Sequence, residues 1–561
     1  MKTRVQHLPA DVHGLSAVAR AGISAGANFE PVPVILRTED ISRPAEGLGS
    51  EERSALVDMM SRGLDGAGLA LAPAARDGLE ALRREGVTCV LTGQQPGLLT
   101  SPLYCLYKAL QACKVAEELS NRWGERVVPV FWNHADDHDI AEVHHAWQLN
   151  RNLDLQKVGL AGLASGRTPL GELPISAEAQ RLDAVRAQLR GVVELHPGAD
   201  AALDLFMPRD GETLPRAFSR TMNELAGRHG LVVCEPAWIR PTLSSEMARL
   251  ISGAGTSTGL TSALRAGESE LVERGLAPAI PVDGRDGDQA AALVYQHLDT
   301  GGAGRPERTA HRASPGGFLR DDDPGERTAA EVGSLIVRQP ERWSAGALVR
   351  PLVQDAVFPT CAYVGGLGEL AYHAQLGPAR DRAGQPRTPF IPRVSLTLVD
   401  EETRHALGRF EAGLEDVLRA SGSFTSEAEE DTEPEVIAAL RKVSEEASSA
   451  LTAHRSEIAA LEPALGITLK KTAKHVRISI EKVIDKAIRV HQNRAGKGAR
   501  QVRRVNHTLM PRNTPQERVL GPFQFVARFG PDFVDALWRE LPATSTEHMV
   551  LHLEDDAGDQ Q

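Results

Sequence analysis

The sequence predicts an α/β protein, in which a parallel sheet core with inserted connective modules is followed by a C-terminal α-helical antiparallel coiled coil. Residues 75–150 read as strand, amphipathic helix and strand, which is the βαβ unit of a parallel sheet. Beyond about residue 430, apolar residues recur at spacings of three and four on both sides of Pro463 and Gly466, which is typical of a helical hairpin. A chain of 561 residues exceeds one hydrophobic core, and we expect roughly two to four substructures.

The strands of the sheet are predicted from short apolar runs. GVTCVLTG and RVVPVFWN flank a helix over 98–123, and GLVVCEP at 230–236 and a run around Tyr363 extend the same sheet. Parallel strands are buried on both faces. We therefore expect these side chains in the core: Val87, Cys89, Val90, Val127, Val128, Val130 and Phe131.

Two insertions are predicted within a core domain of residues 1–400. The insertion near 151–225 reads as amphipathic helix with polar loops, and the insertion near 240–345 contains one short strand, AALVYQHL. We interpret the glycine-rich stretch 301–317 as a surface loop. Residues 401–510 are assigned to the coiled coil, and residues 511–561 to a segment that packs back on the core.

The seam of the coiled coil is predicted from the same apolar spacing. Its positions are Val436, Leu440, Val443, Ala447, Ala450, His454 and Leu461 in the first helix, and Leu469, Ala473, Val476, Ile480, Val483, Ala487 and Val490 in the second. Such a seam can be satisfied inside one subunit or between two.

Composition and charge exclude several classes of protein. The formal net charge of −12, from 63 Lys plus Arg against 75 Asp plus Glu, disfavours nucleic-acid binding. The five cysteines lack the close pairs of zinc sites or disulfide frameworks, and no uncharged stretch approaches the roughly 20 residues of a membrane helix. We therefore expect a cytoplasmic protein that binds neither nucleic acid nor membrane.

The first segment that could carry chemistry is Gly93-Gln94-Gln95-Pro96-Gly97, placed between a predicted strand and a predicted helix. Open α/β sheets bind ligands at this position, where a helix amino terminus offers free N–H groups to a phosphate or carboxylate. Tyr104 and Lys108 share one helix face, and Lys108 could neutralise a phosphate. A structural turn and a surface lysine are the alternatives.

The second segment, Asp136-Asp137-His138-Asp139, follows the strand VVPVFW. Proton transfer and polar substrate contacts rank first here, with His138 as the base because its ordinary pKa is about 6.5. A divalent ion with a nucleotide ranks second and a permanent zinc site last, so we assign no metal ligand. The alternative is a loop whose aspartate caps the next helix.

The third segment combines a glycine-rich turn with two arginines. Tyr363, Gly365, Gly366, Gly368 and Glu369 belong to a second candidate anion-binding turn between strand and helix, although Glu369 could instead favour the helix dipole. Arg350, with Gln354 one turn further on, and Arg393 are candidates for holding a carboxylate.

Taken together, these motifs resemble one known family. The ordered set TGQQPGLLTSPLYCLYKA, VPVFWNHADDHDIAEVHH, RPLVQD, PTCAYVGGLGELAYHAQL, PFIPR and PQERVLGPFQFVARFGPDFVDAL closely resembles BshC, the cysteine-adding enzyme family of bacillithiol biosynthesis. The resemblance runs from about residue 90 to 540. It departs where Ala135-Asp136 replaces Gly-Glu and where Leu367 replaces a proline.

The resemblance implies a Rossmann-like core with inserted modules, a coiled coil used for homodimerisation, and nucleotide binding. It also implies a ligase that joins the carboxyl of L-cysteine to the amine of glucosaminyl-malate. The site residues it carries over are Gln94, Gln95, Pro96, Gly97, Tyr104, Lys108, Asp137, His138, Asp139, Tyr363, Gly365, Gly366, Gly368 and Glu369.

This reading leads to a mechanistic hypothesis. ATP, with Mg²⁺, would activate cysteine over the Gly93–Gly97 turn beside Lys108. His138, oriented by Asp137 or Asp139, would deprotonate the amine. Arg350 or Arg393 would bind the carboxylates of malate. The alternatives are a ligase for another amino acid or amine, and an inactive coiled-coil scaffold.

Overall fold

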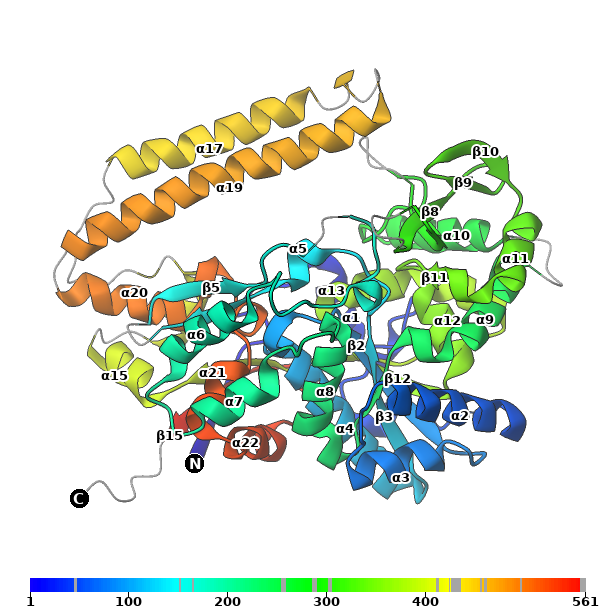
Figure 1. Cartoon of the computed structure of the whole chain (residues 1–561), viewed down its shortest axis with the longest axis horizontal. Helices are drawn as coiled ribbons and strands as arrows, with labels where there is room; N and C mark the ends of the chain where they lie inside the picture. The colour runs from blue at the N-terminus through cyan, green and yellow to red at the C-terminus, as the bar shows by residue number, and fades with distance from the viewer. Residues whose placement is uncertain are drawn as a thin grey trace.

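The computed structural model describes the chain except residues 45–47, 151–152, 164–165, 254–258, 285–289, 301–304, 410–412, 423, 425–434, 455–456, 459–461, 495–496 and 555–561. Figure 1 shows a mixed α/β body with a long helical hairpin along one side. None of the described helices combines the length and the apolar character needed to span a bilayer.

The centre of the body is a five-stranded parallel sheet in the order β13-β12-β2-β3-β6. Its strands are β2 (Thr88–Gln94), β3 (Val127–Asn133), β6 (Val232–Cys234), β12 (Thr360–Gly365) and β13 (Phe390–Pro392). The predicted core residues are all buried. This arrangement confirms the α/β class and the parallel sheet.

Helix α4 (Tyr104–Trp123) connects β2 to β3 and packs on both strands. The sequence predicted this helix from residue 98, and that start was wrong. Residues Leu98–Thr100 form a 3₁₀ turn, in which Leu99 and Thr100 have positive φ. The turn after β2 is therefore separated from the amino terminus of α4.

The first insertion forms the antiparallel hairpin β4 (His145–Leu149) and β5 (Leu155–Gly159). Helices follow it. They are α6 (Leu182–Val193), α7 (Ala199–Phe206) and α8 (Leu214–Ala226). Helices were predicted in this insertion, but the hairpin at its start was not.

The second insertion contains a separate five-stranded antiparallel sheet in the order β10-β9-β8-β7-β11. Its strands are β7 (Ala292–Leu298), β8 (Glu307–Ala313), β9 (Phe318–Arg320), β10 (Asp323–Arg327) and β11 (Trp343–Ala345). Strand β7 was predicted. The stretch 301–317 was predicted to be a surface loop, and this was wrong because β8 lies within it. Polar side chains of β8, including Arg308 and His311, are buried, so the strand has no apolar signature.

Further helices surround the three larger sheets. They are α1 (Ala17–Ala25), α2 (Ser50–Gly66), α3 (Pro73–Ala81), α5 (Ile140–Val143), α9 (Arg240–Ser252), α10 (Leu260–Glu273), α11 (Ala329–Arg338), α12 (Arg350–Val357), α13 (Leu367–His373), α14 (Gly377–Ala383), α15 (Glu401–Arg409), α16 (Leu414–Arg419), α20 (Lys497–Leu509), α21 (Phe523–Phe529) and α22 (Asp532–Glu540).

The two ends of the chain meet in a third sheet. Strand β15 (His548–Glu554) lies between β1 (Lys2–Leu8), which is antiparallel to it, and β14 (Ser395–Val399), which is parallel. The residues after the coiled coil thus return to the strand that directly follows the core sheet.

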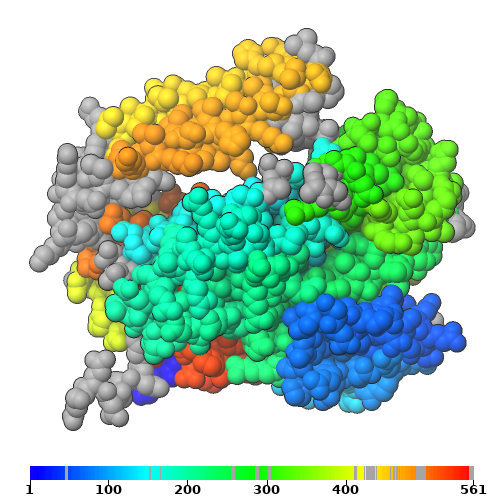
Figure 2. Space-filling model, in the orientation of Figure 1, coloured from blue at the N-terminus to red at the C-terminus, as the bar shows by residue number. Residues whose placement is uncertain are grey.

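The hairpin consists of α17 (Glu435–Ala453) and α19 (Pro463–Arg494), which lie side by side. Figure 2 shows an opening between this hairpin and the core. The predicted seam position Ala473 is buried, but at other positions the observed seam is displaced by one residue. Ile437 and Ile484 are buried, whereas Val436, Val443 and Val483 are 61%, 49% and 55% exposed. The predicted seam position Leu461 and the residues 425–434 lie outside the described part.

This displacement gives a direct test of the seam. We expect Ile437→Asp to reduce the helicity and thermal stability of the hairpin, because it places a charge in the apolar contact between α17 and α19. The matched variant Val436→Asp changes the neighbouring exposed position and should cost less than about 0.5 kcal/mol. Circular dichroism during heating measures both, and equal losses would contradict the observed seam.

Candidate active site

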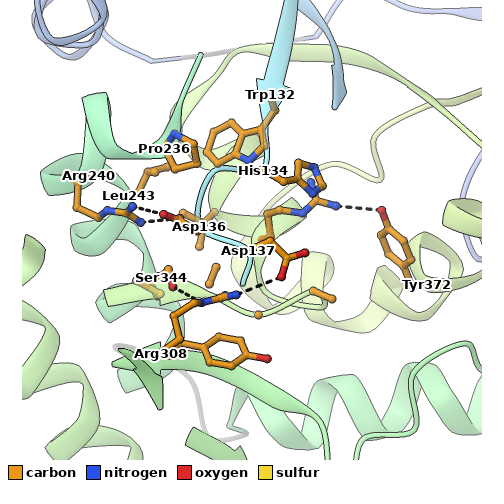
Figure 3. A pocket seen from close by; sticks show the side chains of 17 residues that line it. Trp132, His134, Asp136, Asp137, Pro236, Arg240, Leu243, Arg308, Ser344 and Tyr372 are labelled. Carbon is orange, nitrogen blue, oxygen red and sulfur yellow. Dashed lines mark hydrogen bonds and ion pairs between the residues drawn. The ribbon is translucent and has the colours of Figure 1, made fainter. Parts of the chain in front are cut away.

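A charged cavity of about 260 Å³ lies beyond the carboxyl end of β3. Its walls come from the β3 exit, the start of α9, the antiparallel sheet, α12 and α13 (Figure 3). Ligand pockets usually measure roughly 300–1,000 Å³, so this cavity suits a small metabolite. The lining residues are Trp132, His134, Asp136, Asp137, Pro236, Arg240, Leu243, Met247, Tyr295, Arg308, Ser344, Ala345, Gly346, Ala347, Arg350, Val353 and Tyr372.

Two of the lining arginines are matched by aspartates. Arg240 makes two hydrogen bonds to the carboxylate of Asp136, one of them 2.7 Å long. Burial would raise the pKa of Asp136, but the charge and hydrogen bonds of Arg240, together with the charge of Arg308, lower that pKa below its ordinary value. Arg308 lies 3.6 Å from Oδ1 of Asp137. Three arginines against two aspartates leave the lining with a net charge of +1.

Arg350 is the third arginine, and its hydrogen bonds run to uncharged groups. Nη1 donates to Oε1 of Gln354 at 2.8 Å and Nη2 donates to the hydroxyl of Tyr372 at 2.9 Å. Burial, followed by the charge of Arg350, holds the pKa of His134 well below its ordinary value. The neutral imidazole of His134 does not compensate the positive charge of Arg350. That charge can therefore attract an anionic ligand.

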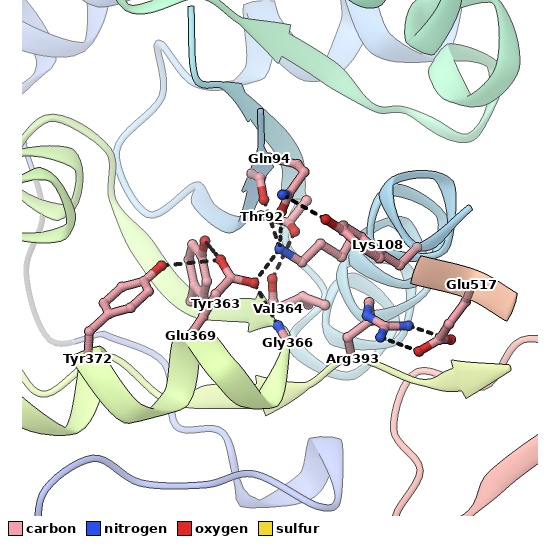
Figure 4. Close-up of polar contacts among 12 residues, drawn as sticks. Thr92, Gln94, Lys108, Tyr363, Val364, Gly366, Glu369, Tyr372, Arg393 and Glu517 are labelled. Carbon is pink, nitrogen blue, oxygen red and sulfur yellow. Dashed lines mark hydrogen bonds and ion pairs between the residues drawn. The ribbon is translucent and has the colours of Figure 1, made fainter. Parts of the chain in front are cut away.

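Lys108 and Glu369 form a second cluster next to the cavity (Figure 4). The ammonium of Lys108 donates to the carbonyl of Gly93 at 2.8 Å, to Oε1 of Gln94 at 3.1 Å and to Glu369. An ammonium has three N–H groups, and these contacts use all of them. The side chain of Lys108 is 1% exposed. Lys108 therefore positions the β2 exit, and no donor remains for a phosphate.

The carboxylate of Glu369 is equally engaged. Oε1 accepts from the hydroxyls of Tyr363 at 2.9 Å and Tyr372 at 3.2 Å, and Oε2 accepts from the N–H of Gly366 at 2.7 Å. Burial alone would raise the pKa of Glu369, but Lys108 and the N–H of Gly366 lower it. Glu369 caps its own helix and ties α13 to the end of β2.

Three of the turn glycines, Gly93, Gly97 and Gly365, are packed too closely to accept a side chain. A Cβ on Gly97 would lie 2.0 Å from the carbonyl oxygen of Ser101, and one on Gly365 would lie 2.6 Å from the ring of Phe390. One on Gly93 would lie 2.7 Å from the carbonyl oxygen of Trp132. The N–H of Gly97 donates to the carbonyl of Gln95. The N–H groups of Gly97 and Gly366 are thus engaged within the protein, and a Cβ on Gly368 would touch nothing within 4 Å.

The predicted segments nevertheless converge. Gln95 donates from Nε2 to Oδ2 of Asp137, which joins the first segment to the second. Lys108 joins the first to the third through Glu369, and Tyr372 connects Glu369 to Arg350. Pro96 follows Gln95 in the same loop, and Gln94 donates to the hydroxyl of Tyr104 at 3.0 Å.

Among the predicted site residues, Asp136, Asp137 and Arg350 line the cavity, and Arg393 is one of those that do not. Its guanidinium makes two hydrogen bonds to the carboxylate of Glu517, at 2.8 and 2.5 Å, and both side chains are buried. This pair joins the core to the segment after the coiled coil. We therefore remove Arg393 from the proposed substrate contacts.

His138 is oriented differently from the prediction. Nη1 of Arg308 lies 3.0 Å from Nδ1 of His138, whereas Oδ1 of Asp137 lies 3.8 Å from the same nitrogen. Asp139 is exposed and precedes the short helix α5 without capping it through its side chain. Arg308 is thus the nearer partner of the ring. His138 is not itself a lining residue of the cavity, but its contacts Arg308 and Asp137 are.

Two lining arginines were missed by sequence reasoning. Arg240 follows β6 at the sheet edge where ligands bind, so the predicted strand 230–236 could have indicated it. Arg308 lies in β8, which has no apolar alternation to reveal it. Among the residues that the structure describes, no group of three His, Cys, Asp or Glu side chains is arranged to hold a metal ion.

Comparison with known proteins agrees with this architecture. The model "Bacillithiol biosynthesis BshC, N-terminal Rossmann-like domain" matches residues 37–394, and the model of the BshC C-terminal coiled-coil domain matches residues 396–553. The chain belongs to the BshC family. This membership confirms the family resemblance and the combination of a Rossmann-like domain with a C-terminal coiled coil.

Relatives in the BshC family are similar over most of their length. One from Koribacter versatilis, named "Putative cysteine ligase BshC", is 26% identical, covering 86% of this chain and 87% of its own. A relative of the same name from Geobacillus thermodenitrificans is 28% identical, covering 89% and 93%. The BshC relative from Chlorobaculum tepidum is 28% identical, covering 85% and 84%.

Proposed function

We propose that this chain is an ATP-dependent ligase that joins the carboxyl of L-cysteine to the amine of glucosaminyl-malate, the last step of bacillithiol biosynthesis. Membership of the BshC family and the names of its relatives support a cysteine ligase. The observation that carries the substrate proposal is the cavity, whose lining has an excess positive charge and contains Arg350. The proposal includes a cytoplasmic location and a homodimer formed through the coiled coil.

Arg350 is proposed to hold a malate carboxylate. The planar guanidinium can bind a carboxylate through two parallel hydrogen bonds. Its present partners, Gln354 and Tyr372, are neutral and fix its orientation. Arg240 and Arg308 already face aspartates, so Arg350 is the lining cation that an anionic substrate would complement.

Asp137 is proposed to accept the proton that the attacking amine releases. It lines the cavity, and its two oxygens accept from Gln95 and from the backbone N–H of His138. Nδ1 of His138 already receives an N–H of Arg308, so the proton-accepting role first considered for His138 passes to Asp137. A carboxylate at hydrogen-bond distance can act as a general base.

ATP is proposed as the activator, because a carboxylate and an ammonium do not form an amide without an activated acyl group. The Gly93–Gly97 turn, the Gly366 turn and Lys108 do not fit triphosphate binding, since their donors at Gly97, Gly366 and Lys108 are engaged within the protein. We therefore assign no residue to ATP or to Mg²⁺.

The test is reconstitution with the purified chain, ATP, L-cysteine and glucosaminyl-malate, followed by mass spectrometry of the trapped thiol. We expect bacillithiol only when all three small molecules are present. Absence of this product with every divalent metal tried would contradict the proposed substrate pair. Product from another amino acid or amine would identify a different ligase, and no product from any pair would favour the scaffold.

A further inference from the structure

The contact between Arg308 and His138 determines where the imidazole carries its proton. Nη1 of Arg308 lies 3.0 Å from Nδ1 of His138. A guanidinium nitrogen can only donate, so Nδ1 accepts with its lone pair. A neutral imidazole has a single N–H, which must then be on Nε2. Within the described part of the chain, no hydrogen bond to Nε2 is formed.

Arg308 is held firmly enough to impose this arrangement. Its Nε donates to Oγ of Ser344 at 3.3 Å, and its guanidinium carbon lies 3.8 Å from the centre of the Tyr295 ring. Its side chain is 6% exposed, compared with 30% for His138. Ser344 and Tyr295 belong to β11 and β7, so the inserted antiparallel sheet fixes the guanidinium from two strands.

We propose that Arg308 is a positioning residue that holds His138 as the neutral Nε2–H tautomer, so that His138 donates a hydrogen bond and does not accept the proton of the amine. The assignment of the tautomer stands on the structure alone. The catalytic part rests on the proposed function: Nε2–H donates to the carbonyl oxygen on which negative charge develops as the amine nitrogen attacks the activated carboxyl. The amine proton passes to Asp137, and the phosphate-containing group that ATP placed on the carboxyl leaves as the amide forms.

The charges around His138 act in both directions. Burial lowers the pKa of His138 below its ordinary value, and the charge of Arg308 lowers it further. Arg167 acts in the same direction, whereas Asp137 and Asp139 oppose it. The ring of Tyr295 lies 6.0 Å from the imidazole and adds no charge. His138 is therefore neutral near pH 7, as a fixed tautomer requires.

Nuclear magnetic resonance of the full chain with ¹⁵N-labelled histidine tests the assignment without substrate or ATP. Long-range ¹H–¹⁵N spectra distinguish the two neutral tautomers, and His138→Gln identifies the signal. We expect Nε2–H in the native protein. We expect Arg308→Met to release the tautomer and to raise the pKa of His138, because a neighbouring positive charge is removed.

Two further variants keep this test decisive. Arg308→Gln also removes the charge and should raise the same pKa, which covers the case that Arg308→Met does not fold. Arg312→Met is the matched control, because Arg312 is on the same strand but pairs with Asp321, and it should leave the signal of His138 unchanged. An Nδ1–H tautomer in the native protein, or no change in the Arg308 variants, would overturn the proposal.

Kinetics separate donation from proton acceptance. A glutamine amide can place an N–H close to Nε2 of histidine but cannot act as a base. We expect His138→Ala to lower kcat roughly 100-fold, as for loss of one oxyanion donor, and His138→Gln to lower it less than about tenfold. Equal losses would contradict the donor role. Absence of product from the native chain would contradict the proposed function and leave the tautomer result standing.

Discussion

Replacing Arg350 with methionine is expected to raise the KM for glucosaminyl-malate and to lower kcat/KM about a hundredfold. Truncating one partner of a desolvated charge pair costs about 2–5 kcal/mol, and about 1.4 kcal/mol corresponds to tenfold. Arg350 lines the cavity between Gln354 and Tyr372. Arg350→Lys keeps the charge but loses the planar fork, so it should recover only part of the loss.

A truncated acceptor provides the control for this prediction. A glucosaminide without malate has no carboxylate for Arg350 to bind. The native chain and Arg350→Met should use it equally poorly, at similar kcat/KM. A large further loss with this acceptor would show that Arg350 supports the fold or the chemistry and not malate binding, and an unchanged KM for glucosaminyl-malate would exclude the contact.

Removing the ammonium of Lys108 is expected to destabilise the core by about 3–5 kcal/mol. Lys108→Met leaves the carboxylate of Glu369 without its ion-pair partner and removes the ammonium that donates to the carbonyl of Gly93. The double variant Lys108→Met/Glu369→Gln should recover part of this stability, because no unpaired charge remains. Chemical denaturation followed by fluorescence and circular dichroism measures all three proteins.

Lys114→Met is the matched control on the same helix. Lys114 lies 3.9 Å from Glu117 and over the ring of Trp538, with 19% of its side chain exposed. Its loss should cost no more than about 1 kcal/mol. If Lys108→Met unfolded at the same denaturant concentration as Lys114→Met, the ion pair would not have the structural role described here.

The sequence predicted the central sheet well for a physical reason. Strands buried on both faces must be continuously apolar, and β2, β3 and β6 have this pattern. Strand β8 was missed because its buried side chains include the polar residues Arg308 and His311, whose hydrogen-bond partners His138 and Gln296 are distant in sequence. The seam of the hairpin was displaced because α17 has apolar residues at both 436 and 437, and spacing alone does not choose between them.

The sequence identified several residues of the candidate site, but it did not identify their hydrogen-bond and ion-pair partners. Carboxyl ends of parallel strands meet at one edge, so the convergence of Gln95 with Asp137 follows from topology. The ammonium of Lys108 donates all its hydrogen bonds to Gly93, Gln94 and Glu369. These partners depend on how deeply α4 packs against the sheet, and no local sequence pattern specifies that depth. Arg393 looked equivalent to Arg350 until its partner Glu517 was located.

The most direct measurement is a crystal structure of the chain with glucosaminyl-malate bound at saturating concentration. We predict a malate carboxylate inside the cavity, within hydrogen-bond distance of the guanidinium of Arg350, and the sugar amine near Asp137. A ligand bound elsewhere, with Arg350 still contacting only Gln354 and Tyr372, would contradict the assignment of this cavity as the active site.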